Sequence, residues 1–139
     1  MPKGFEAQNV WKAKGRGFQM GAIQPDGIVV HLTGQVAWDA EEQVVGIGDV
    51  ETQTRKCFEN IETLLSEVGG KLSDIVAITT YLTNRDQLPG IQKIRLEFLP
   101  AGHEPVSTSV VVAGLGHEHF LVELTPVAVI PRERFRPPE

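Results

Sequence analysis

The sequence predicts a single α+β domain in which two helices pack on one face of a mixed six-stranded β-sheet. Segments of alternating or β-branched residues surround two segments of helical period, in the order β-β-β-α-β-α-β-β. The 139 residues, 41% of them hydrophobic, can fill one core but not two. We expect the core at about residues 18–130, with 131–139, which holds three prolines and three arginines, as a tail outside it.

The first elements are predicted to form a β-hairpin between Gly21 and Ala37. Its two extended pieces flank the turn tripeptide Pro25-Asp26-Gly27, and the second piece, Ile28 to Val36, is rich in β-branched residues. A further turn at residues 39–42 leads to a short predicted strand from Gln43 to Val45.

A change to helical spacing marks the first helix, expected from Asp49 to Val68. Asp49 can cap its start, Gly69-Gly70 ends it, and its apolar stripe comprises Cys57, Ile61, Leu64, Leu65 and Val68. The next segment, Ile75 to Thr83, alternates between apolar and polar residues, and we expect it to be a central strand.

A second helix is expected from about Gln87 to Leu99, with Pro89 tolerated in its first turn. Two strands follow, near Val106 to Ala113 and Phe120 to Ile130, and both carry apolar residues on both faces. Because the helices cover only one face of the sheet, the apolar residues of the other face predict that another subunit covers it. We therefore expect an oligomer.

Composition excludes several classes of partner. The formal net charge is -5 and no basic run is long enough to follow a phosphate backbone, which argues against nucleic acid. No apolar run approaches the roughly 20 residues that span a bilayer. Cys57 is the single cysteine, and the N-terminus lacks the apolar core of a signal peptide, so we expect a cytoplasmic protein.

Glu123 is the most informative residue, because it interrupts the apolar run from Phe120 to Val129. A carboxylate buried there without a partner costs several kcal/mol or takes up a proton. Two interpretations are open. Glu123 serves as a general base in a partly dry cleft, or it is a buried glutamate satisfied by backbone donors or a neighbouring hydroxyl.

Several ordered stretches resemble the reactive intermediate deaminase (Rid, YjgF-like) family: Thr33-Gly34-Gln35, residues 54–65, Tyr81-Leu82-Thr83 and Val122-Glu123-Leu124. The resemblance implies a chorismate-mutase-like fold assembled into barrel-shaped homotrimers. It also implies cofactor-free hydrolysis of small imines or enamines in a cleft between subunits. Glu123 would hold the attacking water, and Thr33 and Gly34 would form part of the pocket floor. From the residues alone, Thr33 is equally an ordinary strand residue and Gly34 a bulge.

The chain departs from the family pattern where members that hydrolyse 2-imino acids carry Pro-Ala-Arg-Ser, because here the segment reads Pro105-Val106-Ser107-Thr108. The arginine of those members binds the substrate carboxylate. A serine hydroxyl supplies neither the positive charge nor the second hydrogen-bond donor of a guanidinium. By the same resemblance, Gln92 and Phe18 replace a substrate-contacting Asn and Tyr. Two hypotheses remain: a hydrolase or deaminase with a changed anchor, or a non-catalytic trimer that binds a small molecule or a partner.

The remaining polar clusters carry weaker signals. Ser107, Thr108 and Ser109 are expected to form a hydrogen-bonding pocket wall, since no Gly-x-Ser-x-Gly elbow accompanies them. The segment His117 to His119 reads as an exposed turn, and we expect neither a metal nor a cofactor. Arg95 either faces water on the second helix or, like Arg85, replaces the missing carboxylate anchor.

Overall fold

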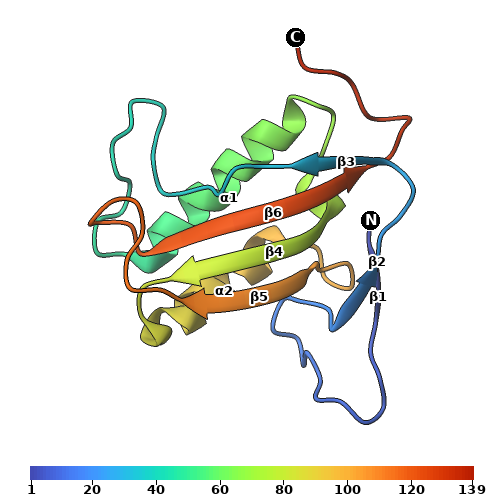
Figure 1. Ribbon diagram of the computed structural model, residues 1–139, viewed down its shortest axis with the longest axis horizontal. Helices are drawn as coiled ribbons and strands as arrows, with labels where there is room; N and C mark the ends of the chain where they lie inside the picture. Colours follow the sequence, from blue (N-terminus) through green and yellow to red (C-terminus); the bar gives the residue numbers. More distant parts are fainter.

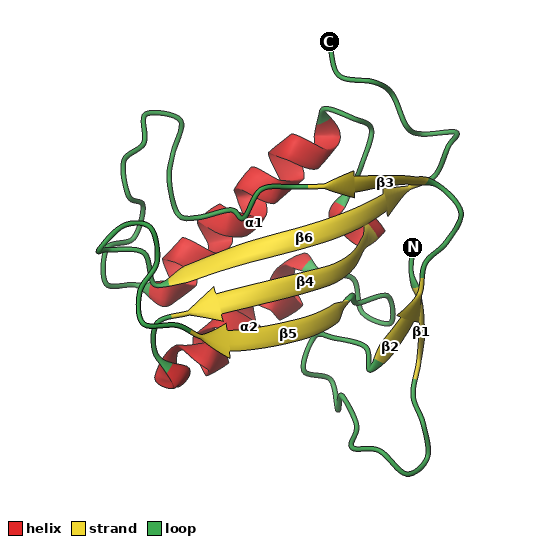
Figure 2. Cartoon of the chain, in the orientation of Figure 1, coloured by secondary structure: helices red, strands yellow, loops and turns green.

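The computed structural model describes residues 1–139, and its centre is a four-stranded mixed sheet with both helices on one face (Figure 1). The strand order is β3-β6-β4-β5, in which β4 runs parallel to β5 and antiparallel to β6, and β3 runs antiparallel to β6 (Figure 2). The strands span β3 (Ile28–His31), β4 (Ile75–Leu82), β5 (Val106–Val111) and β6 (Val122–Ile130). The predicted α+β class is confirmed.

The N-terminal segment forms a separate two-stranded sheet, in which β1 (Lys3–Phe5) pairs antiparallel with β2 (Gly21–Ile23). The predicted hairpin between Gly21 and Ala37 is therefore wrong, and six strands form in two sheets instead of one. The backbone N–H of Gln19 donates to the Pro105 carbonyl at 3.0 Å, which holds the start of β2 at the edge of β5. Residues 24–27 then carry the chain across to β6 instead of folding it back.

β3 is shorter than predicted, because regular pairing with β6 stops at His31. Contact with β6 resumes only as an isolated bridge between Gln35 and Leu124. The short strand expected from Gln43 to Val45 is likewise reduced to a single bridge, between Trp38 and Val44. The intervening chain bends away from a regular ladder near Gly34, beside Glu123.

α1 (Val50–Ser66) begins where the Asp49 side chain accepts a hydrogen bond from the Thr52 N–H at 3.2 Å. The helix ends at Ser66, and the turn that follows it contains Gly69, whose φ of 81° is the left-handed conformation that glycine adopts without strain. Leu64 departs from the predicted stripe and is 40% exposed, since it lies at the edge of the arc that faces the sheet. The residues of α1 that do enter the core include Cys57, Phe58, Ile61 and Leu65.

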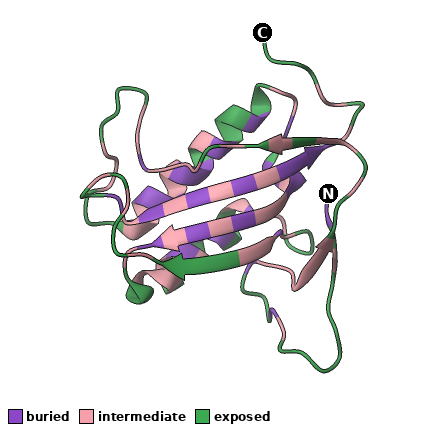
Figure 3. Cartoon of the chain, viewed as in Figure 1, coloured by how far each residue is buried: buried purple, intermediate pink, exposed green.

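α2 (Leu88–Phe98) follows a 3₁₀ turn (Arg85–Gln87), and Phe98 stacks on Phe58 of α1 with ring centroids 5.1 Å apart. Neither helix combines the length and hydrophobicity needed to cross a membrane. Buried and half-buried residues alternate along β4 and β6 (Figure 3), so every second side chain of these strands points away from the helices. That open face carries Glu123.

The C-terminal tail lies outside the hydrophobic core but is fastened to the domain. Asp74 is fully buried and receives two hydrogen bonds from the Arg134 guanidinium, at 2.6 and 2.9 Å. The backbone N–H of Arg136 also donates to the Val68 carbonyl at 3.2 Å. The hydrogen bond to Asp74 raises the pKa of Arg134 above its usual value.

Candidate functional site

Glu123 lies on the open face of the sheet, directly across from Tyr81 on β4. Its side chain is half-buried and takes part in no hydrogen bond or ion pair within the chain. No buried side-chain oxygen or nitrogen of the protein lacks a hydrogen-bond partner, so the unpaired carboxylate oxygens of Glu123 must remain accessible. The alternative of a glutamate satisfied by neighbouring donors therefore does not describe this side chain. Its carboxylate is free to accept a proton or hold a water molecule.

Gly34 makes room for this carboxylate. A Cβ atom added at Gly34 would lie 2.9 Å from Glu123 Cδ and 3.0 Å from Thr125 Oγ1. Two backbone hydrogen bonds between Gln35 and Leu124, of 2.7 and 3.0 Å, hold the glycine in this position against β6. A side chain at position 34 would therefore displace the end of the Glu123 side chain, and the glycine leaves the carboxylate its space.

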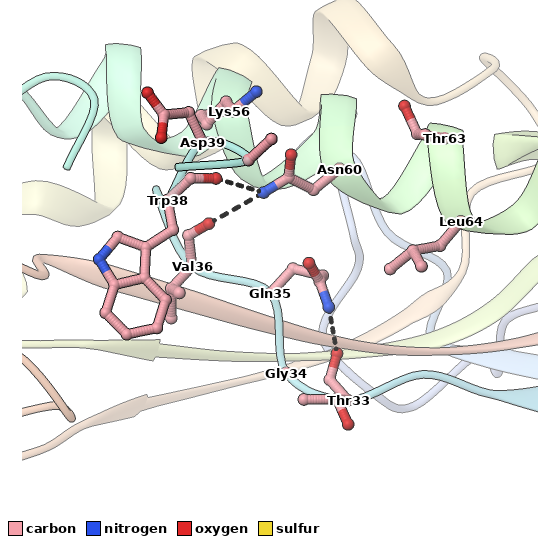
Figure 4. A pocket seen from close by; sticks show the side chains of 11 residues that line it. Thr33, Gly34, Gln35, Val36, Trp38, Asp39, Lys56, Asn60, Thr63 and Leu64 are labelled. Carbon is pink, nitrogen blue, oxygen red and sulfur yellow. Dashed lines mark hydrogen bonds between the residues drawn. The ribbon is translucent and has the colours of Figure 1, made fainter. Parts of the chain in front are cut away.

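Thr33 and Gly34 also line a cavity of about 580 Å³ between residues 33–40 and α1 (Figure 4). Asn60 of α1 closes one side of it, where its Nδ2 donates to two backbone carbonyls of the 33–40 segment at 3.0 and 3.2 Å. The side chain of Gln35 donates to the Thr33 carbonyl at 3.0 Å. Glu123 is not part of this cavity's lining. The 33–40 segment therefore separates it from the carboxylate.

Three other predicted site residues, Phe18, Gln92 and Ser107, meet on the helix side of the sheet. They line a cavity of about 370 Å³ between α2, β5 and the N-terminal loop, a volume within the range of small-molecule sites. Its full lining is Trp11, Arg16, Phe18, Leu88, Gln92, Arg95, Ser107 and Ser109. The sequence pattern gave no reason to include Trp11 or Arg16, because residues 6–17 have no periodicity and form no strand or helix.

Thr108 points to the opposite face from Ser107, as alternation along the strand predicts. It pairs with Thr79 of β4, which in turn pairs with Thr125 of β6, so these three threonines form one row on the face of Glu123. β4 separates β5 from β6, and two strand spacings amount to about 10 Å. Within one chain the predicted residues therefore do not share one site. Glu123 and Thr108 lie on the open face of the sheet, the cavity of Ser107 lies on the helix side, and Thr33 lines the separate cavity against α1.

Arg95 of α2 does not face water, contrary to one of the two sequence interpretations. It is 2% exposed, and its Nη2 donates to Thr80 Oγ1 at 3.0 Å. Burial lowers the pKa of its guanidinium, and no carboxylate of the chain pairs with it. The spacing of Leu88, Gln92 and Arg95 on one helical face was the available signal for this position. Arg85, the other candidate anchor, is exposed and lines neither cavity.

No three His, Cys, Asp or Glu side chains are arranged to hold a metal ion. The rings of His117 and His119 lie 5.5 Å apart in the loop before β6, where His117 also contacts Phe120. Cys57 is buried in the core as predicted. Burial, and to a lesser extent the charge of Glu123, raise the pKa of its thiol to about 12, so it is a poor nucleophile at neutral pH.

These features define a class of small α+β proteins that known structures share. A Rid-family protein of Yersinia pestis, YyfB, superposes with a TM-score of 0.86 over 93% of this chain and 98% of its own, at 24% sequence identity. Residues 16–130 match the model of the family described as Endoribonuclease L-PSP. The chain belongs to this family, which comprises the Rid or YjgF-like proteins, and the predicted resemblance is confirmed.

Two curated relatives support the assignment. The 3-aminoacrylate deaminase RutC of Acinetobacter baylyi is 31% identical over 100 residues, which cover 72% of this chain and 78% of the relative. A RutC family protein of Pyrococcus abyssi is 28% identical over 102 residues, covering 73% of this chain and 79% of the relative.

Proposed function

We propose that the protein is a cofactor-free hydrolase that deaminates a small imine or enamine, with Glu123 holding the attacking water. The observation that carries this proposal is an accessible carboxylate without an intramolecular partner, held on β6 beside a glycine that leaves it space. A deaminase of 3-aminoacrylate among the relatives of this chain supports the same chemistry.

In this mechanism the water oxygen forms a bond to the imine carbon while the Glu123 carboxylate accepts one of its protons. The carboxylic acid then returns this proton to the imine nitrogen, which gives a carbinolamine. Glu123 next accepts the proton of the new hydroxyl group and passes it to the same nitrogen. The carbon–nitrogen bond breaks, ammonia leaves and a carbonyl forms, so one water is consumed for each ammonia released. Glu123 ends the cycle ionised, as it began, and no redox step or cofactor enters the balance.

We further propose that the complete site lies between subunits of a homotrimer. Glu123 and the cavity containing Ser107 occupy opposite faces of one sheet, so a single chain cannot present both to one small ligand. A second copy can bring its cavity to the Glu123 face of the first. Val110 of β5, which is 39% exposed and lies in register with Glu123 through Tyr81, offers apolar surface for such an interface.

A second candidate function is a trimer that binds a small molecule or partner without turnover. Ser107 favours it, because the carboxylate-gripping arginine of the imine-hydrolysing relatives is missing there. The hydrolase remains the better-supported candidate, because a non-catalytic binding site gives no reason to keep an unpaired carboxylate beside a glycine.

We propose that nucleic acid is not a partner, although the family description contains the word endoribonuclease. The chain is acidic, with 13 Lys and Arg against 18 Asp and Glu, and its sequence contains no long basic run. A single, buried cysteine also fits a reducing compartment, and we place the protein in the cytoplasm on that ground.

The test is ammonia release from freshly generated 2-imino acids and from 3-aminoacrylate, measured beside an arginine-containing family member. Glu123→Gln should lower kcat by about 10²-fold or more, because the amide cannot accept the proton, and should leave the oligomer intact. Glu118→Gln, which changes an exposed acid five residues away, is the matched control and should leave kcat unchanged. Full activity of Glu123→Gln would refute the mechanism. If the wild-type protein releases no ammonia while the arginine-containing family member does, the binding trimer is favoured instead.

A further inference from the structure

The cavity between α2, β5 and the N-terminal loop has an unusual charge. Two of its eight lining residues are arginines, Arg16 and Arg95, and none is acidic. This concentration of positive charge occurs in a protein whose net charge is -5. Arg16 is exposed at the mouth of the cavity, whereas Arg95 is buried at its wall.

Arg95 has no compensating charge within the chain. Its one hydrogen bond is to the Thr80 hydroxyl, a neutral acceptor, whereas buried guanidinium groups are usually paired with carboxylates. Since no buried side-chain nitrogen lacks a hydrogen-bond partner, the remaining donors of Arg95 must keep access to solvent through the cavity. An anion entering the cavity would meet these free donors and neutralise a buried cation.

The fold holds this guanidinium in place. Thr80 fixes it from the side of β4, and Gly17 packs against its aliphatic stem from the N-terminal loop. A Cβ atom at Gly17 would lie 3.0 Å from Arg95 Cδ, and Gly17 has a φ of 88°, so both space and backbone conformation require glycine there. A cation fixed before binding loses little conformational entropy when a ligand arrives.

We propose that Arg95 anchors the carboxylate of a ligand with a small apolar or aromatic tail, the role that position 107 has lost in this chain. Ser107 and Ser109 lie on the same wall and offer hydroxyl donors to the second carboxylate oxygen. Trp11 and Phe18, in edge-to-face contact with centroids 5.9 Å apart, provide the apolar surface for the tail. The inference rests on the proposed function in one respect only, that the imine substrate is an imino acid.

A neutral ligand does not account for this arrangement, because it would leave the buried charge of Arg95 unpaired and displace the water that solvates it. The small side chain of Ser107 contributes as well. An arginine at 107 would place a second guanidinium in the same cavity, so the two positions are alternative locations for one anchor.

The test is calorimetric titration of the intact protein with phenylacetate and with phenylacetamide, which share a shape but differ in charge. Phenylacetate should bind at least about tenfold more tightly, since only it can form charge-assisted hydrogen bonds with the guanidinium. Equal affinities for the two compounds, or no binding of phenylacetate, would overturn the proposal. This comparison needs no variant and so does not depend on whether substitutions in the cavity fold.

Variants then locate the anchor. Arg95→Gln can keep a hydrogen bond to Thr80 but removes the charge, and it should weaken phenylacetate binding about tenfold or more without affecting phenylacetamide. Arg95→Lys should restore part of the affinity, because it keeps the charge but not the planar fork. Arg85→Gln, the control on an exposed arginine, should bind like the wild type. Unchanged phenylacetate affinity in Arg95→Gln, or a loss in Arg85→Gln, would contradict the assignment.

Failure of this inference and failure of the proposed function give different results. Glu123→Gln should still bind phenylacetate, and that binding should still depend on Arg95, because Glu123 belongs to the catalytic step and not to the anchor. If phenylacetate binding depends on Arg95 but the protein has no deaminase activity, the anchor proposal holds and the hydrolase proposal is wrong. If the protein is a deaminase and Arg95→Gln does not affect its activity, the hydrolase proposal holds and the anchor proposal is wrong.

Discussion

Gly34→Ala tests whether the placement of the Glu123 carboxylate matters for turnover. The added methyl group would lie 2.9 Å from Glu123 Cδ, whereas ordinary contacts of a Cβ atom begin at 3.4 Å. The carboxyl group must therefore move by at least 0.5 Å, and its nearer oxygen by more. Displacements of this size at a reacting group lower the rate by about 10- to 100-fold. We expect that loss in kcat for ammonia release.

The loss should come from the position of Glu123 and not from misfolding. The displaced group is the end of a flexible side chain, so the midpoint of thermal unfolding should change little. Gly116→Ala is the matched control, because a Cβ atom there meets nothing within 4 Å. In a Glu123→Gln background, Gly34→Ala should have no further effect on kcat, since both changes act through one carboxylate. Unchanged kcat in Gly34→Ala, or an additive loss in the double variant, would refute the reasoning.

Two further predictions concern stability. Arg134→Met leaves the buried Asp74 without its ion-pair partner and should lower the free energy of unfolding by about 3 kcal/mol in urea titrations. Arg132→Met, which breaks an exposed pair with Asp26, is the control and should lower it by less than about 0.5 kcal/mol. Equal effects of the two would show that the tail is not fastened through Asp74. The Cys57 thiol has a pKa of about 12 in the folded protein, against an ordinary value of 9.0. The unfolded chain therefore binds fewer protons than the folded one above pH 9. The free energy of unfolding should fall as pH rises through this range, by about 1 kcal/mol near pH 10. Cys57→Ala should lack that part of the fall, and an identical pH profile for both proteins would contradict the explanation.

The elements with a strong period were predictable from the sequence, and those defined by their partners were not. α1, α2, β4 and β6 follow the periods of their apolar residues. Asp49 caps the start of α1, and Gly69 lies in the turn that follows its last residue, Ser66. The hairpin failed because a turn signal such as Pro25-Asp26-Gly27 is local and does not specify which strand a segment joins. The actual partner of β2, a three-residue strand at Lys3–Phe5, is too short to show a pattern.

The same distinction applies to the site. Glu123 and Gly34 stood out because an acid in an apolar strand and a glycine in an extended segment are each unusual on their own. The only signal for Arg95 was its helical spacing from Leu88 and Gln92. Because a helical arginine is usually exposed, only the packing of α2 on β4 shows that it is buried. That Phe18 and Ser107 share a cavity depends on how the N-terminal loop packs against β5, which no local pattern encodes.

The central claim is that Glu123 of one subunit completes a site on its neighbour. Mixing two inactive variants tests this claim most directly. Glu123→Gln and Arg95→Gln should each be nearly inactive alone, whereas trimers assembled from both in equal amounts should contain some sites with both residues intact. Random assembly predicts recovery of about a quarter of the wild-type ammonia release, if each site takes Glu123 from one chain and Arg95 from its neighbour. A mixture no more active than its separate components would contradict a site shared between subunits.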